Sequence, residues 1–146
     1  ERCNRTFWSQ SAGDQLASGT CLDVDPATGL TGLAWAGLPA MLRLSTEGHE
    51  WLGGPRLTIG SEPDAGFARR QLRLDRGDAL VILGERIERA VTESREPLDR
   101  TALATMLSDH RHVSAIELTE LVRAFLDSHR LDPETEDRSL LAIKRQ

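Results

Sequence analysis

The sequence of 146 residues is 39% hydrophobic and 28% charged, a composition typical of one globular domain. Its net charge is −5, and no basic run exceeds Arg69, Arg70 and the nearby Arg73, so we expect no nucleic acid partner. No apolar stretch approaches the roughly 18 residues that span a bilayer, and residues 1–20 lack a signal-peptide pattern. We therefore expect a cytoplasmic protein without membrane association.

The cysteines and histidines give no metal-binding or disulfide pattern. Cys3 and Cys21 are the two cysteines, and their spacing favours free thiols over a disulfide framework or a zinc site. His110 and His112 lie two residues apart in a predicted loop, and no histidine pair has the i, i+4 spacing of a helical metal site. We interpret the histidines as surface residues.

The first half of the chain predicts strands. Residues 1–18 form an N-terminal segment, either helix or loop, and alternation begins at Thr20. Turn residues at positions 25–29 join a first strand containing Leu22 and Val24 to a return strand. We place that return strand at residues 30–35, the next strands at 41–44 and 50–52, and all four in one antiparallel meander.

A loop and a buried strand follow the meander. Residues 53–66 are rich in Gly and Pro and predict a long loop, and residues 71–74 alternate again. After a tight turn at 75–78, the continuous apolar run 79–83 is typical of a central strand covered on both faces.

The last third of the chain predicts two helices and a closing strand. The first helix spans residues 98–107, and Ser114 begins the second, with Glu117 at capping-box spacing. A strand at 139–143 ends an α+β domain in which helices pack on antiparallel sheet. The second helix carries one apolar stripe that we assign to the core: Ile116, Leu118, Leu121, Val122, Phe125 and Leu126.

Five segments, in order, resemble the metal-dependent (PPM-type) protein Ser/Thr phosphatases of the stage II sporulation protein E branch. They match an Asp-Pro-x-Thr-Gly turn, an Ala-Gly-His-Pro segment, a Gly-Gly-x-x-Leu-Gly loop, a Leu-x-Pro-Gly-Asp strand start and an Asp-Asp-x-Thr segment. The matching residues are 22–29, 34–39, 53–57, 74–83 and 136–141. The resemblance implies the later two-thirds of an α/β/β/α sandwich, with stacked antiparallel sheets flanked by helices, in residues 19–146.

The sequence departs from the family pattern at several functional positions. Leu38 stands where the family has His, and Gly84, Glu85 and Arg86 replace its Thr-Asp-Gly, whose Asp is a metal ligand. Glu136 and Asp137 match the family's two acids, whereas the early Gly-Asp-x-x-Gly-His-Gly motif occurs nowhere in this sequence.

The resemblance implies a site for Mn²⁺ or Mg²⁺, which would activate a water for direct attack on phosphorus. Its candidate ligands are Asp137, Glu85 and Glu136, and we identify no catalytic nucleophile or base. Such cations need several converging oxygen ligands, so we expect weak or absent metal binding. Arg86 brings a positive charge beside the expected cation.

Simpler interpretations of these residues remain open. Glu85 and Arg86, together with Glu88 and Arg89, match a solvated charged segment after a strand. Asp137 equally fits a turn residue that caps backbone donors.

Three functions follow from these patterns. The first is a bacterial regulatory pseudophosphatase that binds a phosphorylated anti-sigma-factor antagonist in stress or sporulation signalling. The second is an active Mn- or Mg-dependent phosphoserine/phosphothreonine phosphatase whose early metal motif lies outside this chain. The third is an unrelated α+β interaction domain. If early strands are missing, open sheet edges favour a homodimer.

Overall fold

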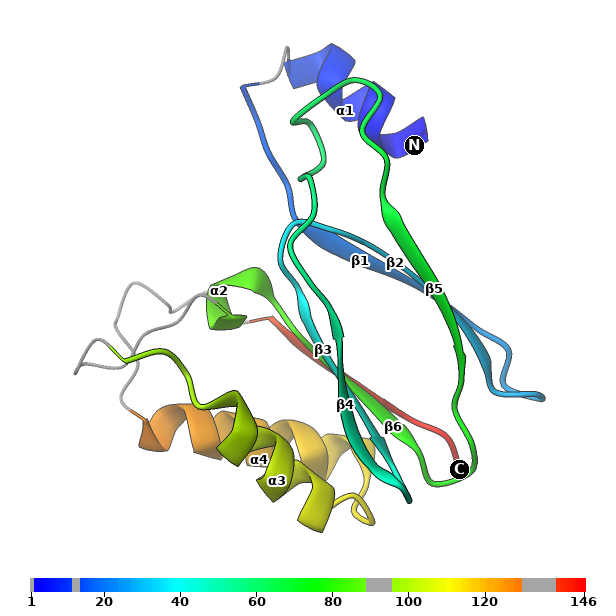
Figure 1. Ribbon diagram of the computed structural model, residues 1–146, viewed down its shortest axis with the longest axis vertical. Helices are drawn as coiled ribbons and strands as arrows, with labels where there is room; N and C mark the ends of the chain where they lie inside the picture. The colour runs from blue at the N-terminus through cyan, green and yellow to red at the C-terminus, as the bar shows by residue number, and fades with distance from the viewer. Residues whose placement is uncertain (1, 12–13, 89–95, 130–138) are drawn as a thin grey trace. The chain divides into compact units, whose positions relative to one another are not determined.

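The computed structural model describes residues 2–11, 14–88, 96–129 and 139–146 (Figure 1). The chain forms two compact units, Glu1–Pro39 with Gly53–Arg73, and Ala40–Leu52 with Leu74–Gln146. Each unit contains one antiparallel sheet, which confirms the expected α+β class. Among the described residues, none of the helices has the length and apolarity needed to cross a membrane.

The first unit holds α1 (Arg2–Ser11) and a three-stranded sheet in the order β1-β2-β5. Its strands are β1 (Gly19–Val24), β2 (Leu30–Ala36) and β5 (Ala68–Arg73). The predicted hairpin between the first two strands is confirmed, because the Asp25 carboxylate accepts the Ala27 N–H at 2.9 Å and the Thr28 hydroxyl at 2.6 Å. These bonds hold the turn in the shape that the sequence predicts.

A buried asparagine fixes α1 to the irregular segment that precedes β5. The side-chain amide of Asn4 donates to the carbonyls of Glu62 (2.8 Å) and Pro63 (3.1 Å), and its Oδ1 accepts the Gly60 N–H at 2.9 Å. Gly60 has a φ of +87°, and a Cβ there would lie 2.4 Å from the carbonyl oxygen of Gln15. Only glycine suits this close approach.

The second unit is built on a four-stranded sheet in the order β4-β3-β6-β7. The strands are β3 (Ala40–Ser45), β4 (Gly48–Gly53), β6 (Ala79–Leu83) and β7 (Leu140–Lys144). All five residues of β6 are buried, and β6 pairs with β3 on one side and β7 on the other. The prediction of a central strand at 79–83 is therefore confirmed.

The single antiparallel meander expected for the first four strands is wrong. β1 and β2 belong to one sheet, whereas β3 and β4 belong to the other. The chain changes sheet between Gly37, whose φ is +79°, and Pro39, which has no backbone N–H to continue a ladder.

Helices cover the sheet of the second unit, as expected from the sequence (Figure 1). They are α2 (Glu85–Glu88), α3 (Arg100–Asp109) and α4 (Ala115–Ser128). The side chain of Asp99 caps α3 by accepting the Ala102 N–H at 2.9 Å. The core beneath the helices joins residues from both layers, among them Leu42, Leu44, Val81, Leu83, Leu103, Leu107, Leu118, Val122 and Leu126.

The predicted capping box at the start of α4 is present. The Ser114 hydroxyl accepts the Glu117 N–H at 3.2 Å, and the Glu117 carboxylate accepts the Ser114 N–H at 2.8 Å. The backbone hydrogen bond from Ser114 lowers the pKa of Glu117, with a smaller contribution from the Ser114 side chain.

One member of the predicted apolar stripe does not belong to the core. Leu118, Val122 and Leu126 are buried, at an i, i+4 spacing that defines the inner face of α4. Ile116 is 75% exposed. It lies two positions before Leu118, and a step of two residues on an α-helix turns the side-chain direction by about 200°.

Candidate functional site

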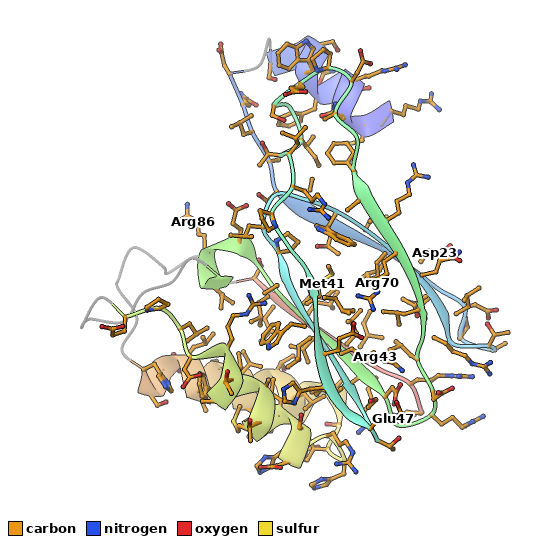
Figure 2. All side chains as sticks on the ribbon, in the orientation of Figure 1. Asp23, Met41, Arg43, Glu47, Arg70 and Arg86 are labelled. Carbon is orange, nitrogen blue, oxygen red and sulfur yellow. The ribbon has the colours of Figure 1, made fainter. Side chains whose placement is uncertain are left out.

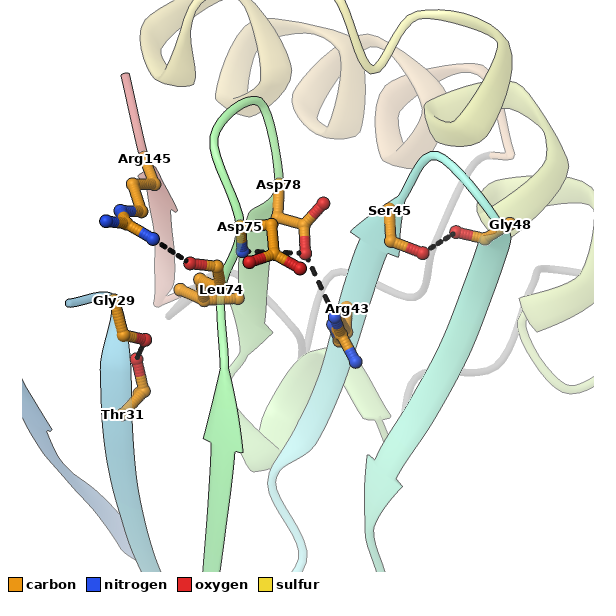
Figure 3. Close-up of polar contacts among 9 residues, drawn as sticks. All are labelled: Gly29, Thr31, Arg43, Ser45, Gly48, Leu74, Asp75, Asp78 and Arg145. Carbon is orange, nitrogen blue, oxygen red and sulfur yellow. Dashed lines mark hydrogen bonds and ion pairs between the residues drawn. The ribbon is translucent and has the colours of Figure 1, made fainter.

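A buried carboxylate fixes the start of β6. Asp78 is 2% exposed, and its Oδ2 accepts hydrogen bonds from the Arg43 guanidinium at 3.0 Å and from the Asp75 N–H at 3.1 Å (Figure 3). The Arg145 side chain donates to the Leu74 carbonyl at 2.8 Å. These contacts hold the turn that leads into the central strand.

The other end of β6 lies beside the start of β7. Leu83 pairs with Leu140, and the Gly84 N–H donates to the Ser139 carbonyl at 2.9 Å. A Cβ on Gly84 would come 2.0 Å from Ser139 Oγ and 3.2 Å from the Ser139 carbonyl oxygen. The backbone at position 84 is therefore packed too closely on Ser139 to accept a larger side chain without movement.

The short helix α2 presents the two charged residues that replace the family pattern. Ile87 is fully buried, and its N–H donates to the Gly84 carbonyl at 3.0 Å. Glu85 is half-buried and Arg86 is exposed. Figure 2 shows the Arg86 side chain projecting away from α2. Burial of Ile87 thus anchors a helix whose first two residues are a carboxylate and a guanidinium.

The structure does not test the predicted set of metal ligands. Glu85 lies at the end of β6, whereas Glu136 and Asp137 fall outside the described residues. Within residues 2–11, 14–88, 96–129 and 139–146, no group of three or more His, Cys, Asp or Glu side chains is placed to hold a metal ion. The described residues by themselves therefore form no metal centre of that kind.

Two of the resembling segments pair with each other in the first unit. The Gly37 N–H donates to the Leu57 carbonyl at 3.1 Å, and the Arg56 N–H donates to the Gly37 carbonyl at 2.9 Å. Trp35 is buried, and its Nε1 donates to the Gly54 carbonyl at 3.2 Å. Leu38, at the family's His position, is half-buried beside this pairing.

The tryptophans pack within their units, and His110, His112 and both cysteines match the sequence predictions. Trp35 packs in the sheet of the first unit, and Trp51 is half-buried with the Arg100 guanidinium 4.2 Å from its ring centroid. His110 and His112 are exposed, and Cys3 and Cys21 are free thiols on the surface.

Sequence reasoning missed the ion pair between Arg43 and Asp78 and the hydrogen bonds of the buried Asn4 side chain. A signal for the ion pair exists, because Asp78 directly precedes a fully apolar run and Arg43 interrupts the apolar strand β3. No comparable local signal marks Asn4, whose partners lie almost 60 residues away, at separations of 56 to 59 positions.

A family model described as stage II sporulation protein E (SpoIIE) matches residues 1–146. No curated protein sequence matches the chain significantly. The match over the whole chain shows that the third interpretation, an unrelated interaction domain, is wrong.

Solved structures show the same fold. The RsbU and RsbW domains of Rv1364c from Mycobacterium tuberculosis match with a TM-score of 0.75 and 21% identity, over 97% of this chain and 40% of that one. The PPM Ser-Thr phosphatase MsPP from Mycobacterium smegmatis matches with a TM-score of 0.68 and 15% identity, over 99% of this chain and 70% of that one. The phosphatase domain of SpoIIE from Bacillus subtilis matches with a TM-score of 0.61 and 11% identity, over 98% of this chain and 65% of that one.

The chain thus spans 40% to 70% of the length of these three solved chains. The likeness establishes the fold of PPM-type Ser/Thr phosphatase domains and confirms the expected architecture of antiparallel sheets flanked by helices.

Proposed function

Because the chain belongs to the stage II sporulation protein E (SpoIIE) family, we propose that it is a regulatory Ser/Thr protein phosphatase domain with impaired catalysis, a pseudophosphatase. We further propose that it binds a phosphorylated anti-sigma-factor antagonist in the bacterial cytoplasm. The family match and the phosphatase fold support the general assignment. The loss of catalytic power rests on the residues that follow β6.

The arrangement of residues 84–86 carries the proposal. The family's Thr at position 84 would require Ser139 to move, since a Cβ there would lie 2.0 Å from Ser139 Oγ. Glu85 extends one methylene further than the family's Asp, and productive sites tolerate displacements of only about 0.5 Å. Exposed Arg86 adds a cation where the family has Gly. The segment is thus rebuilt at three successive positions.

Leu38 supports the same proposal from the first unit. Its backbone neighbour Gly37 is held by Leu57 and Arg56, so the position is defined by hydrogen bonds. An isobutyl side chain neither coordinates a cation nor donates or accepts a proton, which removes the chemistry that a His would bring.

Metal titration combined with a phosphatase assay tests the proposal. We would titrate Mn²⁺ by calorimetry into the wild-type chain, Glu85→Ala and Asp137→Ala, with the surface change Asp109→Ala as the matched control. In the same buffer we would measure binding of a phosphoserine peptide and its unphosphorylated form, and phosphate release. We expect weak or absent Mn²⁺ binding, no release above buffer, and preference for the phosphorylated peptide.

The opposite result would favour the second candidate function, an active Mn- or Mg-dependent phosphatase. The presence of acids at positions 85, 136 and 137 is the observation in its favour. An active phosphatase would show micromolar Mn²⁺ binding that disappears in Asp137→Ala, together with measurable phosphate release. In that case Glu85→Asp combined with Arg86→Gly should raise turnover in the longest polypeptide that contains this chain.

We also propose that the chain forms a homodimer through the outer edge of β7. Within the described residues, β7 pairs with β6 alone, and its Leu141 is 47% exposed. Unpaired strand edges promote pairing with a second chain. Light scattering should show a mass that rises with concentration, and Leu141→Lys should shift it toward the monomer. A constant monomer mass in the wild type would refute the dimer.

A further inference from the structure

The turn between α3 and α4 brings two histidine rings together. α3 ends at Asp109 and α4 begins at Ala115, and His110 and His112 lie in the short connection between the helices. Both side chains are exposed, their ring centroids are 6.4 Å apart, and their ring planes differ by 23°. The turn therefore presents two neighbouring imidazoles to solvent, although the pair lacks the i, i+4 spacing of a site on a helix.

A hydrogen bond determines which nitrogen of His110 carries the proton. His110 Nδ1 lies 2.8 Å from the carbonyl oxygen of Met106. A carbonyl can only accept, so Nδ1 donates, and the neutral ring keeps its lone pair on Nε2. Metal-bound histidines donate their second nitrogen to a carbonyl or carboxylate in the same way, which fixes the ring and makes the coordinating nitrogen more basic. His110 Nε2 is thus prepared to bind a cation.

The imidazole of His112 can approach the same point. Among the described residues, its ring lies next to that of His110 and makes no hydrogen bond, so the exposed side chain is able to rotate. With Zn–N distances of about 2.0–2.1 Å, and about 1 Å more from each nitrogen to its ring centre, two imidazoles on one ion have centroids roughly 5–6 Å apart. The observed separation of 6.4 Å needs only a small closing movement.

The charges around the two rings permit a bound cation. The carboxylates of Asp109 and Glu117 balance the guanidinium of Arg111 and the ammonium of Lys144. The Lys144 ammonium is engaged by the turn, where it donates to the carbonyls of Arg111 and Val113 at 2.5 and 2.6 Å. The rings also follow the last turn of α3, and the C-terminal end of a helix carries a negative partial charge that favours cations.

His129 provides an internal comparison with a single histidine. It is the C-cap of α4, as His110 is the C-cap of α3, and its Nδ1 lies 2.7 Å from the carbonyl oxygen of Phe125. Its ring stacks on Phe125, and the sequence has no other histidine next to it. When a first imidazole holds an ion, a second one nearby binds that ion intramolecularly, at a high effective concentration. Only the pair at the α3–α4 turn offers this gain.

We propose that His110 and His112 form a binding site for a divalent transition-metal ion. His110 coordinates through Nε2, His112 supplies a second nitrogen, and water fills the remaining positions. Imidazole favours Cu²⁺, Ni²⁺ and Zn²⁺, whereas Mg²⁺ and Mn²⁺ prefer oxygen ligands. With two protein ligands, the site is smaller than the groups of three or more that are absent from the described residues. It is separate from residues 84–86, so it goes beyond the proposed function.

Calorimetric titration of metal ions provides the first test. The parent is the untagged chain with Cys3→Ser and Cys21→Ser, since exposed thiols also bind these metals. We expect Cu²⁺ to bind more tightly than Zn²⁺ or Ni²⁺. His110→Ala and His112→Gln should each lower the Zn²⁺ affinity at least about tenfold, and the matched control His129→Ala should stay within about twofold.

Three results of the titration would overturn the proposal: no Zn²⁺ or Cu²⁺ binding by the parent, undiminished binding in His112→Gln, or an equal loss in His129→Ala. Mn²⁺ binding through the acids at positions 85, 136 and 137 would persist in His112→Gln. The titration therefore separates this site from the metal site considered under the proposed function.

Electron paramagnetic resonance of bound Cu²⁺ tests whether both rings hold one ion. We expect coupling to two imidazole nitrogens in the parent and to one in His110→Ala or His112→Gln. Thermal denaturation without metal should be the same for His112→Gln and the parent, because the exposed ring of His112 makes no hydrogen bond among the described residues. Coupling to a single imidazole in the parent would refute the shared site.

Discussion

The guanidinium of Arg43 and the carboxylate of Asp78 form an ion pair, with 3.0 Å between Nη2 and Oδ2, at the junction of β3 and β6. The Asp78 side chain is 3% exposed and that of Arg43 is 27% exposed. Arg43 Nε has no hydrogen-bond partner among the described residues, so Asp78 is the principal compensation for this charge.

Removing the Asp78 carboxylate should therefore strongly destabilise the second unit. We expect Asp78→Ala to lower the free energy of unfolding by about 3 kcal/mol, because an uncompensated charge stays partly buried and the Asp75 N–H loses its acceptor. Urea denaturation measures the change, with the exposed Asp109→Ala as control. In the double variant Arg43→Met and Asp78→Leu the loss should be smaller than the sum of the single losses. Additive losses would show that the pair contributes no coupling.

Enlarging residue 84 should strain the junction of β6 and β7. We expect Gly84→Ala to cost about 1–2 kcal/mol, because its Cβ would meet Ser139 Oγ at 2.0 Å and the Ser139 carbonyl oxygen at 3.2 Å. Ser139→Ala should recover part of this loss by removing the nearest atom. Thermal denaturation of both variants and their combination measures the effect. A stability gain in Gly84→Ala would refute the close packing.

The capping box of α4 should give a stability difference that depends on pH. The pKa of Glu117 is lower in the folded chain than in the unfolded one, so the unfolded state binds more protons and the stabilisation is present above the unfolded pKa. It is lost as pH falls through the lower, folded-state pKa. The stability difference between wild type and Glu117→Gln should be constant near neutral pH and shrink in acid. A difference that grows in acid would have the wrong sign.

Loss of the Asn4 amide should release α1 from its partner segment. Asn4→Ala removes the donor for Glu62 and Pro63 and the acceptor for Gly60, and buried groups without partners cost about 1–3 kcal/mol each. Hydrogen exchange at residues 58–64 should accelerate. Gln10→Ala, on the exposed surface of α1, is the control and should leave exchange unchanged. Unchanged hydrogen exchange in Asn4→Ala would show that the Asn4 hydrogen bonds do not hold this segment in place.

Local patterns predicted elements better than they predicted partners. The apolar run of β6, the turn at Asp25 and the capping box of Ser114 each depend on residues within a few positions, and each is confirmed. The start of β5 was missed because Arg69 and Arg70 break the alternation, although the sheet extends to Ala68. Ile116 was misassigned because a broad stripe was read without the exact helical phase.

The candidate site was predictable only where the family resemblance identified it. Motif order pointed to Glu85, and the structure adds the contact between Gly84 and Ser139 that joins two segments separated by 55 positions. Periodicity carries no information about such a distant contact. Glu136 and Asp137 remain predictions, since they lie outside the described residues, and so does the division at residue 18.

The position of β7 has a consequence for how the second unit folds. Its partner β6 ends at Leu83, yet β7 begins at Leu140, and Lys144 then donates to the carbonyls of Arg111 and Val113 between α3 and α4. Strands so far apart in sequence can pair only after a long loop has closed, and the entropy lost in closing the loop slows folding. During synthesis, β6 emerges before β7, so the edge of β6 that pairs with β7 is unpaired until β7 has been made. An unpaired strand edge is a template for pairing with another chain, so β6 is open to misassembly over that interval.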